Sequence, residues 1–156
     1  EVEVAMVIGK KGKNISEDKA QDHVFGYCIV NDVSERSWQK ERGGQWIKGK
    51  SIAGPCGPYL VTKDEIKDIN NLNLSLDVNG ERRQTGNTER MIFNFNFLVS
   101  HISHFMTLYP GTIITTGTPA GTAMEMDMPK FLQVGDKLSL KVDHLGEQNH
   151  IVVEES

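Results

Sequence analysis

The sequence predicts an α+β domain that is rich in β-strands and contains one principal helix. Residues 2–8 form a run of β-favouring apolar side chains interrupted by one glutamate, and residues 72–78 alternate strictly between apolar and polar side chains. Between Met91 and Met106, apolar side chains instead recur in steps of three, three and one, which is the spacing of an amphipathic helix. Strand patterns therefore dominate, with one long helical pattern among them.

Two buried strands joined by a short helix are expected to open the chain. Residues 2–8 and residues 24–30 are both apolar and rich in β-formers, which predicts one strand each. Ser16 is expected to cap a short helix over residues 17–23, whose first turn is acidic. The polar segment 34–42 predicts one or two further helical turns.

The middle of the chain is expected to form a loop, a short strand and a hairpin. Residues 46–58 are rich in glycine and proline, which predicts a loop, and residues 58–62 predict the strand that follows. The strand over residues 72–78 is expected to turn its leucines and its valine inward. An Asn-Gly pair at 79–80 is a strong signal for a two-residue turn, so residues 81–85 are expected to form the return strand.

The last part of the chain holds the long helix and a second hairpin. Thr88 is expected to cap the helix that carries the apolar stripe. Residues 112–116 predict a strand, and the loop 116–121 that follows consists of small residues. The final hairpin is expected to pair residues 138–142 with residues 150–153 around Leu145-Gly146.

Composition limits the classes of function. One domain is expected over residues 1–156, and upstream sequence is expected to precede it because residue 1 already enters a buried-type strand. The formal net charge is −4, the pI is near 5.7 and no basic tract occurs, which argues against nucleic acid or membrane as the main partner. Two cysteines do not make a disulfide framework, so a reducing, cytoplasmic compartment is expected.

Three carboxylates form the first candidate site. In a strand, Glu1 and Glu3 lie on one face, about 7 Å apart along the backbone, and Asp32 follows the end of the second apolar run. An oxygen-only site of this kind suits Mg²⁺, Mn²⁺ or Ca²⁺ rather than zinc. The alternative is structural: two glutamates on an exposed edge strand and an aspartate in a turn.

Other polar residues carry weaker signals. Arg36 and Gln39 share a helical face that begins beside Asp32, whereas Lys50 lies in a glycine-rich loop where most lysines are only solvated. The loop 116–121 could offer backbone N–H groups to an anion or could be a simple tight turn. Cys28, His101 and His104 are expected to have structural rather than chemical roles; the cysteine packs in a strand, and the histidines lie at the surface.

Taken in order, the motifs resemble those of the fumarylacetoacetate hydrolase family over essentially the whole chain. The resemblance is carried by ten stretches: Glu1-Val2-Glu3, Val7-Ile8-Gly9, Gly26-Tyr27, Asn31-Asp32-Val33-Ser34-x-Arg36-x-x-Gln39, Trp46-x-x-Gly49-Lys50-Ser51, Gly57-Pro58, Val78-Asn79-Gly80-Glu81, Met91-Ile92-Phe93, Thr116–Gly121 and Gly135-Asp136. It implies a catalytic domain with a β-roll-like fold of mixed sheets, found as a homodimer.

The resemblance also implies roles for individual residues. Glu1, Glu3 and Asp32 would bind one Mg²⁺ or Mn²⁺, with Ca²⁺ also compatible, and the ion would chelate a small 2-oxo acid and stabilise its enolate. Lys50 would supply a fixed positive charge. The remaining positions would contact substrate: Arg36 and Gln39 would orient it, and Gly117 and Thr118 would hold its carboxylate.

The activity implied is hydrolytic C–C cleavage of a 2-oxo or 1,3-dicarbonyl acid, as for acylpyruvates. Decarboxylation or tautomerisation of oxaloacetate and isomerisation of a dienoate would use the same enolate. An inactive family-like binding scaffold is a further alternative. It is motivated by two departures from the family pattern. Lys50-Ser51 runs into Ile52-Ala53-Gly54 where many members read K-S-x-D-T, and the path from Lys50 to Gly57-Pro58 is shorter than in those members. In addition, no sequence matches the His-Glu pair of the family's lid.

Overall fold

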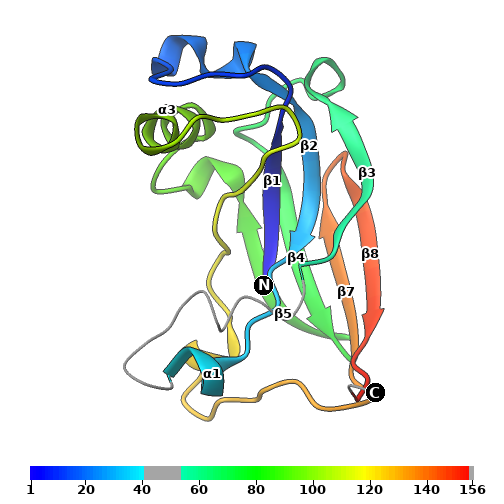
Figure 1. Cartoon of the computed structure of the whole chain (residues 1–156). Coiled ribbons are helices and arrows are strands. Elements are labelled where there is room, and N and C mark those ends of the chain that lie inside the picture. The colour runs from blue at the N-terminus through cyan, green and yellow to red at the C-terminus, as the bar shows by residue number, and fades with distance from the viewer. Residues whose placement is uncertain (41–53, 155–156) are drawn as a thin grey trace.

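Two four-stranded sheets pack face to face in this protein (Figure 1). The computed structural model describes residues 1–40 and 54–154. Every strand pair in the described residues is antiparallel, so the sheets are not mixed as the family resemblance implied. The predicted α+β, β-rich class with one principal helix is confirmed. No helix within these residues is long and apolar enough to cross a bilayer.

The first sheet has the order β3-β2-β1-β6. Its strands are β1 (Val2–Ile8), β2 (Val24–Asn31), β3 (Cys56–Thr62) and β6 (Ile113–Thr115). The first two match their predicted ranges closely. β3 begins two residues before the expected strand, and β6 is shorter than expected, so it covers only part of the edge of β1.

The second sheet has the order β5-β4-β7-β8. Its strands are β4 (Asn73–Val78), β5 (Glu81–Asn87), β7 (Lys137–Val142) and β8 (Gly146–Ile151). Asn79 and Gly80 have φ values of 52° and 80°, as the predicted two-residue turn requires. The turn of the final hairpin lies where it was predicted, with His144 at φ 63° directly before Leu145 and Gly146. The expected return strand 150–153 is wrong in its start: β8 begins at Gly146 and is a polar edge strand without the apolar pattern that would reveal it.

The core lies between the two sheets. Because side chains alternate across a strand, Val2, Val4, Met6 and Ile8 all point from β1 toward the second sheet, where they pack with Leu74, Leu76 and Leu140. Each such side chain contributes about 1.5–3 kcal/mol by leaving water. The same alternation places Glu3 of β1, and Glu1 directly before the strand, on the opposite face.

The principal helix, α3 (Phe95–Phe105), begins later than predicted. Asn94 caps it by accepting a hydrogen bond from the Phe97 N–H at 2.8 Å. Thr88 is not the cap: its hydroxyl donates to the Ile69 carbonyl at 2.7 Å and accepts from the Leu72 N–H at 2.9 Å. Tertiary hydrogen bonds therefore use the hydroxyl that the sequence pattern assigned to a helix end.

The apolar stripe of α3 is only partly buried. Phe95 and Val99 are in the core, whereas Phe105 and Met106 are 76% and 55% exposed. The shorter helices of the described ranges 1–40 and 54–154 are η1 (Glu17–Asp22), α1 (Arg36–Lys40), η2 (Lys63–Glu65), η3 (Thr88–Arg90) and η4 (Ala123–Glu125). Ser16 occupies the predicted cap position of η1 but makes no capping hydrogen bond. The predicted turns at 41–42 and most of the loop 46–58 lie outside the described residues.

Beyond the end of β6, side chains rather than a strand form the hydrogen bonds along the edge of β1. The Thr116 hydroxyl donates to the Val4 carbonyl at 2.7 Å, and the Thr118 hydroxyl donates to the Val2 carbonyl at 3.0 Å. The Val2 N–H in turn donates to Gln84 Oε1 at 3.0 Å. These bonds fix the loop that follows β6 against the beginning of β1, where the candidate site lies.

Gly121 is expected to be indispensable to this loop. Its φ is +109°, and a Cβ at this position would lie 2.0 Å from the Arg83 carbonyl oxygen. We expect Gly121→Ala to lower the free energy of unfolding by about 2–4 kcal/mol, through backbone strain and overpacking. Urea denaturation measures this change. Gly54→Ala is the control, because a Cβ there would meet open space; equal stability of the two variants would contradict the account.

Candidate active site

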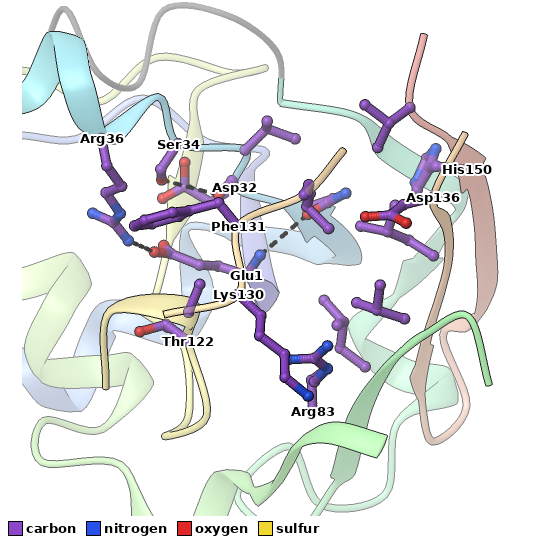
Figure 2. A pocket seen from close by; sticks show the side chains of 18 of the residues that line it. Glu1, Asp32, Ser34, Arg36, Arg83, Thr122, Lys130, Phe131, Asp136 and His150 are labelled. Atoms are coloured by element: carbon purple, nitrogen blue, oxygen red, sulfur yellow. Dashed lines mark hydrogen bonds and ion pairs between the residues drawn. The ribbon is translucent and has the colours of Figure 1, made fainter. Parts of the chain in front are cut away.

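A cavity of about 1060 Å³ opens at the end of the sandwich where β1 begins (Figure 2). Its rim includes Glu1, Asp32 and Arg36, and its far wall includes Arg83 and Lys130. Apolar side chains from the strands of the second sheet line the space between them: Leu76, Val78 and Leu138. The cavity therefore joins an acidic region to a basic region across a hydrophobic surface.

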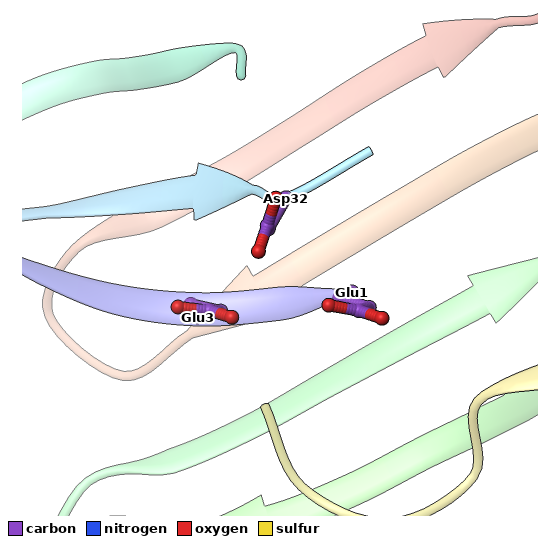
Figure 3. Close-up of side chains that lie close together, drawn as sticks. All are labelled: Glu1, Glu3 and Asp32. Atoms are coloured by element: carbon purple, nitrogen blue, oxygen red, sulfur yellow. The ribbon is translucent and has the colours of Figure 1, made fainter. Parts of the chain in front are cut away.

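Three carboxylates meet at the acidic end (Figure 3). The antiparallel pairing of Val2 with Asn31 brings Glu1, directly before β1, close to Asp32, directly after β2. The Asp32 N–H donates to the Glu1 carbonyl at 2.9 Å. Glu3 lies on the same face of β1 as Glu1. One carboxylate oxygen from each of Glu1, Glu3 and Asp32 lies within 4.8 Å of the others. The structure thus brings together the three residues that the sequence singled out.

The donor set fits a hard divalent cation. Oxygens on opposite sides of one Mg²⁺ or Ca²⁺ lie about 4–5 Å apart, which matches the spacing of this cluster. All three donors are carboxylates, which hard cations prefer, and no thiolate or imidazole is among them. Glu3 is only 3% exposed and accepts a hydrogen bond from the Gly117 N–H at 2.9 Å. Glu1 and Asp32 are half-buried, so the cluster lies between the core and the cavity that Glu1 and Asp32 line.

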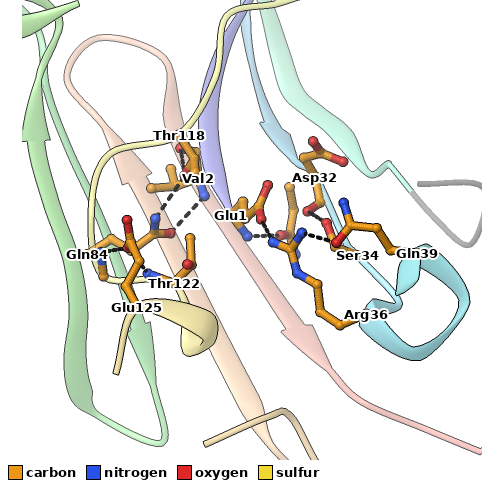
Figure 4. Close-up of polar contacts among 12 residues, drawn as sticks. Glu1, Val2, Asp32, Ser34, Arg36, Gln39, Gln84, Thr118, Thr122 and Glu125 are labelled. Atoms are coloured by element: carbon orange, nitrogen blue, oxygen red, sulfur yellow. Dashed lines mark hydrogen bonds and ion pairs between the residues drawn. The ribbon is translucent and has the colours of Figure 1, made fainter. Parts of the chain in front are cut away.

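Arg36 and Gln39 approach the cluster from α1 (Figure 4). Arg36 Nη2 forms an ion pair with Glu1, and Arg36 Nη1 donates to Gln39 Oε1 at 2.7 Å. Gln39 is 3% exposed, and its Nε2 atom is buried with no hydrogen-bond partner among the described residues. A buried amide donor left unsatisfied costs about 1–3 kcal/mol. This donor is therefore suited to a ligand oxygen.

Gly117 and Thr118 hold β1 in place. The Gly117 N–H is used by Glu3, and the Thr118 hydroxyl donates to Val2 while accepting from Gln84 Nε2 at 2.8 Å. A role for these two residues in binding a substrate carboxylate stays a prediction. Lys50 lies outside the described residues, so its predicted catalytic role also stays a prediction.

The cysteines and histidines have the structural positions that were predicted. Cys28 is buried beside Ala5 and Val30, and its sulfur lies 3.0 Å from that of Cys56. Burial raises the pKa of the Cys28 thiol to about 12, so it is protonated at neutral pH and is a poor nucleophile. His101 and His104 are both exposed on α3.

Comparison with known proteins identifies the family. The model of the fumarylacetoacetate (FAA) hydrolase C-terminal domain matches residues 1–153. The chain belongs to the fumarylacetoacetate hydrolase family. The predicted family is thus confirmed over nearly the whole chain.

The curated relatives that this chain matches are longer than the chain itself. A Burkholderia cenocepacia protein whose name describes it as a hydrolase is 52% identical over 151 residues, which is 95% of this chain and 54% of that protein. The chain therefore spans about half the length of the curated relatives that it matches.

Solved structures of the family have the same fold. The fumarylacetoacetate hydrolase of Exiguobacterium antarcticum is 38% identical, with a TM-score of 0.94 over 99% of this chain and 56% of its own. The 2-hydroxyhepta-2,4-diene-1,7-dioate isomerase of Mycobacterium marinum is 38% identical, with a TM-score of 0.88 over 100% of this chain and 58% of its own. The fumarylpyruvate hydrolase of Pseudomonas aeruginosa was solved with Mn²⁺ and pyruvate. It is 32% identical, with a TM-score of 0.88 over 99% of this chain and 65% of its own.

The sequence motifs did not reveal the basic end of the cavity. Arg83 and Lys130 belong to no motif that was singled out, and both are simply polar residues near turns in the sequence. Only the strand pairing around Arg83 shows that its side chain lies at the cavity. A weak signal was available in the pair of adjacent arginines after the Asn-Gly turn, since strict alternation would send one of them toward the core.

Proposed function

We propose that this protein is a divalent-metal-dependent hydrolase that cleaves a C–C bond of a small 2-oxo or 1,3-dicarbonyl acid of the acylpyruvate type. The observation that carries this proposal is the cluster of Glu1, Glu3 and Asp32 at the mouth of a cavity with basic residues. The relative solved with Mn²⁺ and pyruvate supports both the kind of ion and the kind of ligand. Mg²⁺ or Mn²⁺ is the proposed cofactor, and Ca²⁺ is also compatible with the donor set.

In this proposal each group near the site has a separate task. Glu1, Glu3 and Asp32 hold the cation, which when bound supplies Lewis-acid stabilisation of negative charge developing on the substrate's carbonyl oxygen. Arg36 fixes Glu1 and Gln39 in place through its two guanidinium nitrogens. The buried Gln39 Nε2 donates to a substrate oxygen, which orients the 2-oxo acid. Lys50 adds a positive charge that favours the transition state over the ground state.

Isomerisation of a dienoate is the second candidate, because the solved Mycobacterium marinum isomerase is also 38% identical to this chain. Oxaloacetate decarboxylation or tautomerisation would need the same three carboxylates. An inactive scaffold is disfavoured because the three carboxylates together form a ligand set that suits a hard divalent cation. A single catalytic domain, a homodimer and a cytoplasmic location stay predictions.

Turnover of three substrates tests the proposal. Acetylpyruvate, oxaloacetate and 2-hydroxyhepta-2,4-diene-1,7-dioate are each incubated with the protein and Mg²⁺ or Mn²⁺, and then with excess chelator. The proposal expects chelator-sensitive formation of acetate and pyruvate from acetylpyruvate. Chelator-sensitive turnover of either other substrate alone would replace hydrolysis by that reaction. Turnover that persists in chelator would contradict the metal-dependent class.

A further inference from the structure

Arg83 reaches the cavity because β5 contains a bulge. Leu76 pairs with Gln84, but the next residue of β4, Asp77, pairs with Arg82, so Arg83 is an extra residue in the strand. A bulge re-aims side chains relative to the regular alternation of a strand. Arg82 forms an ion pair with Asp77 and is half exposed, whereas Arg83 lines the cavity.

The hydrogen-bond partners of the Arg83 guanidinium are weak or absent among the described residues. Its side chain is 13% exposed, and its Nε atom is buried with no hydrogen-bond partner among the described residues. Nη1 lies 3.2 Å from the sulfur of Met126, which is a weak acceptor, and Nη2 lies 3.4 Å from Glu81 Oε2. Glu81 is 60% exposed, so water screens much of this pair. An arginine stays charged, so this position retains unused capacity to bind an anion.

The surroundings hold this arginine in place and add positive charge. Gly121 packs directly on the Arg83 backbone, and a capping box between Thr122 and Glu125 fixes the segment that presents Met126. Lys130 Nζ lies 4.0 Å from the other oxygen of Glu81, so two cations share one exposed carboxylate. Asp136 also lines the cavity and attracts Arg83 electrostatically, but its two oxygens accept hydrogen bonds from the Asn79 side chain and the Gln133 N–H. The open hydrogen-bonding capacity of Arg83, rather than a net positive charge, therefore distinguishes this end of the cavity.

We propose that Arg83, assisted by Lys130, binds a second carboxylate of the substrate and so selects 2-oxo diacids over monoacids. This assignment rests on the proposed function, because it places the 2-oxo acid group at Glu1, Glu3 and Asp32. The apolar wall between the two ends would contact the carbon chain that joins the two acid groups. A guanidinium binds a carboxylate through two parallel hydrogen bonds, which makes it a strong determinant of this selectivity.

Paired substrates test the assignment. The first is 2,4-dioxoheptanedioate, and the second is its 7-amide, which has the same shape without the distal charge. We expect wild-type protein to prefer the diacid, and Arg83→Met to lower kcat/KM for the diacid by about 10- to 100-fold, with little change for the amide. Arg83→Lys should recover part of the preference. Arg82→Met is the matched control, since Arg82 belongs to the same strand but lies outside the cavity.

Ligand binding separates failure of this assignment from failure of the proposed function. Calorimetry in the presence of Mn²⁺ compares 2-oxoadipate with 2-oxohexanoate, which have six carbons each and differ in the distal carboxylate. The assignment expects tighter binding of 2-oxoadipate by wild type and by Arg82→Met, and loss of that difference in Arg83→Met. If neither dioxo acid is turned over, the hydrolase proposal fails and this comparison alone decides the role of Arg83. Equal binding of the two oxo acids by wild type, or no binding of either, would overturn the assignment.

Discussion

Asp32→Ala is expected to abolish metal-dependent turnover. The substitution removes one of three carboxylates whose oxygens lie within 4.8 Å of one another, and a hard cation loses both a ligand and a unit of negative charge. Losing the several kcal/mol of charge stabilisation that such an ion supplies lowers kcat/KM by about 10³-fold or more. Initial rates at increasing Mn²⁺ concentration, with and without chelator, measure the effect.

Two further variants make the result specific to Asp32. Asp32→Asn keeps the size of the side chain and should be nearly as inactive, because an amide oxygen contributes a weaker, neutral ligand. Asp22→Asn removes an equal charge from an exposed position on η1 and should leave the rate unchanged. Activity of Asp32→Ala within a few-fold of wild type, in a folded protein, would show that the cluster is not the reactive centre.

Replacing Arg36 is expected to have the second largest effect. Arg36 is paired with Glu1 and also donates to Gln39, so Arg36→Met leaves both without the group that positions them. Residues that orient metal ligands typically contribute 10- to 100-fold to metal affinity or activity, so we expect a loss of about 10²-fold in kcat/KM. The Mn²⁺ concentration that gives half-maximal rate should rise as well, since Glu1 loses its orientation.

A second variant separates the effect of the Arg36 charge from that of the shape of its guanidinium group. Arg36→Lys should recover only part of the activity, because one ammonium group does not reproduce the fixed fork that contacts two residues at once. Arg90→Met is the control, since the Arg90 side chain is 81% exposed and does not line the cavity beside Glu1 and Asp32. An unchanged rate and an unchanged Mn²⁺ requirement in Arg36→Met would show that Arg36 does not position the residues of the site.

Local patterns predicted most of the strands because local forces decide them. The apolar run of β1 and the alternation of β4 each match a face that packs in the core, and the Asn-Gly turn has the positive φ values that those residues favour. The start of α3 was wrong because tertiary hydrogen bonds use the Thr88 hydroxyl. β8 was misplaced because an edge strand needs no apolar alternation.

The candidate site was predictable to the extent that its residues lie at strand ends. Glu1, Glu3 and Asp32 come together because β1 and β2 are neighbours in register, which an apolar pair of strands with carboxylates at the matching ends already indicates. Arg83 could not be predicted, since the bulge that directs it into the cavity depends on the pairing of β4 with β5. The catalytic role of Lys50 is predicted from the family resemblance alone.

A calorimetric titration with Mn²⁺ tests the central claim most directly, because it asks whether the three carboxylates bind a cation and needs no substrate. The titration compares wild type with Glu3→Gln, which keeps the hydrogen bond from Gly117 possible but removes the charge. Glu17→Gln, at an exposed position, is the control. The account predicts one ion per wild-type and control chain, with affinity at least about 10-fold weaker in Glu3→Gln. No binding by wild type, or equal binding by wild type and Glu3→Gln, would contradict it.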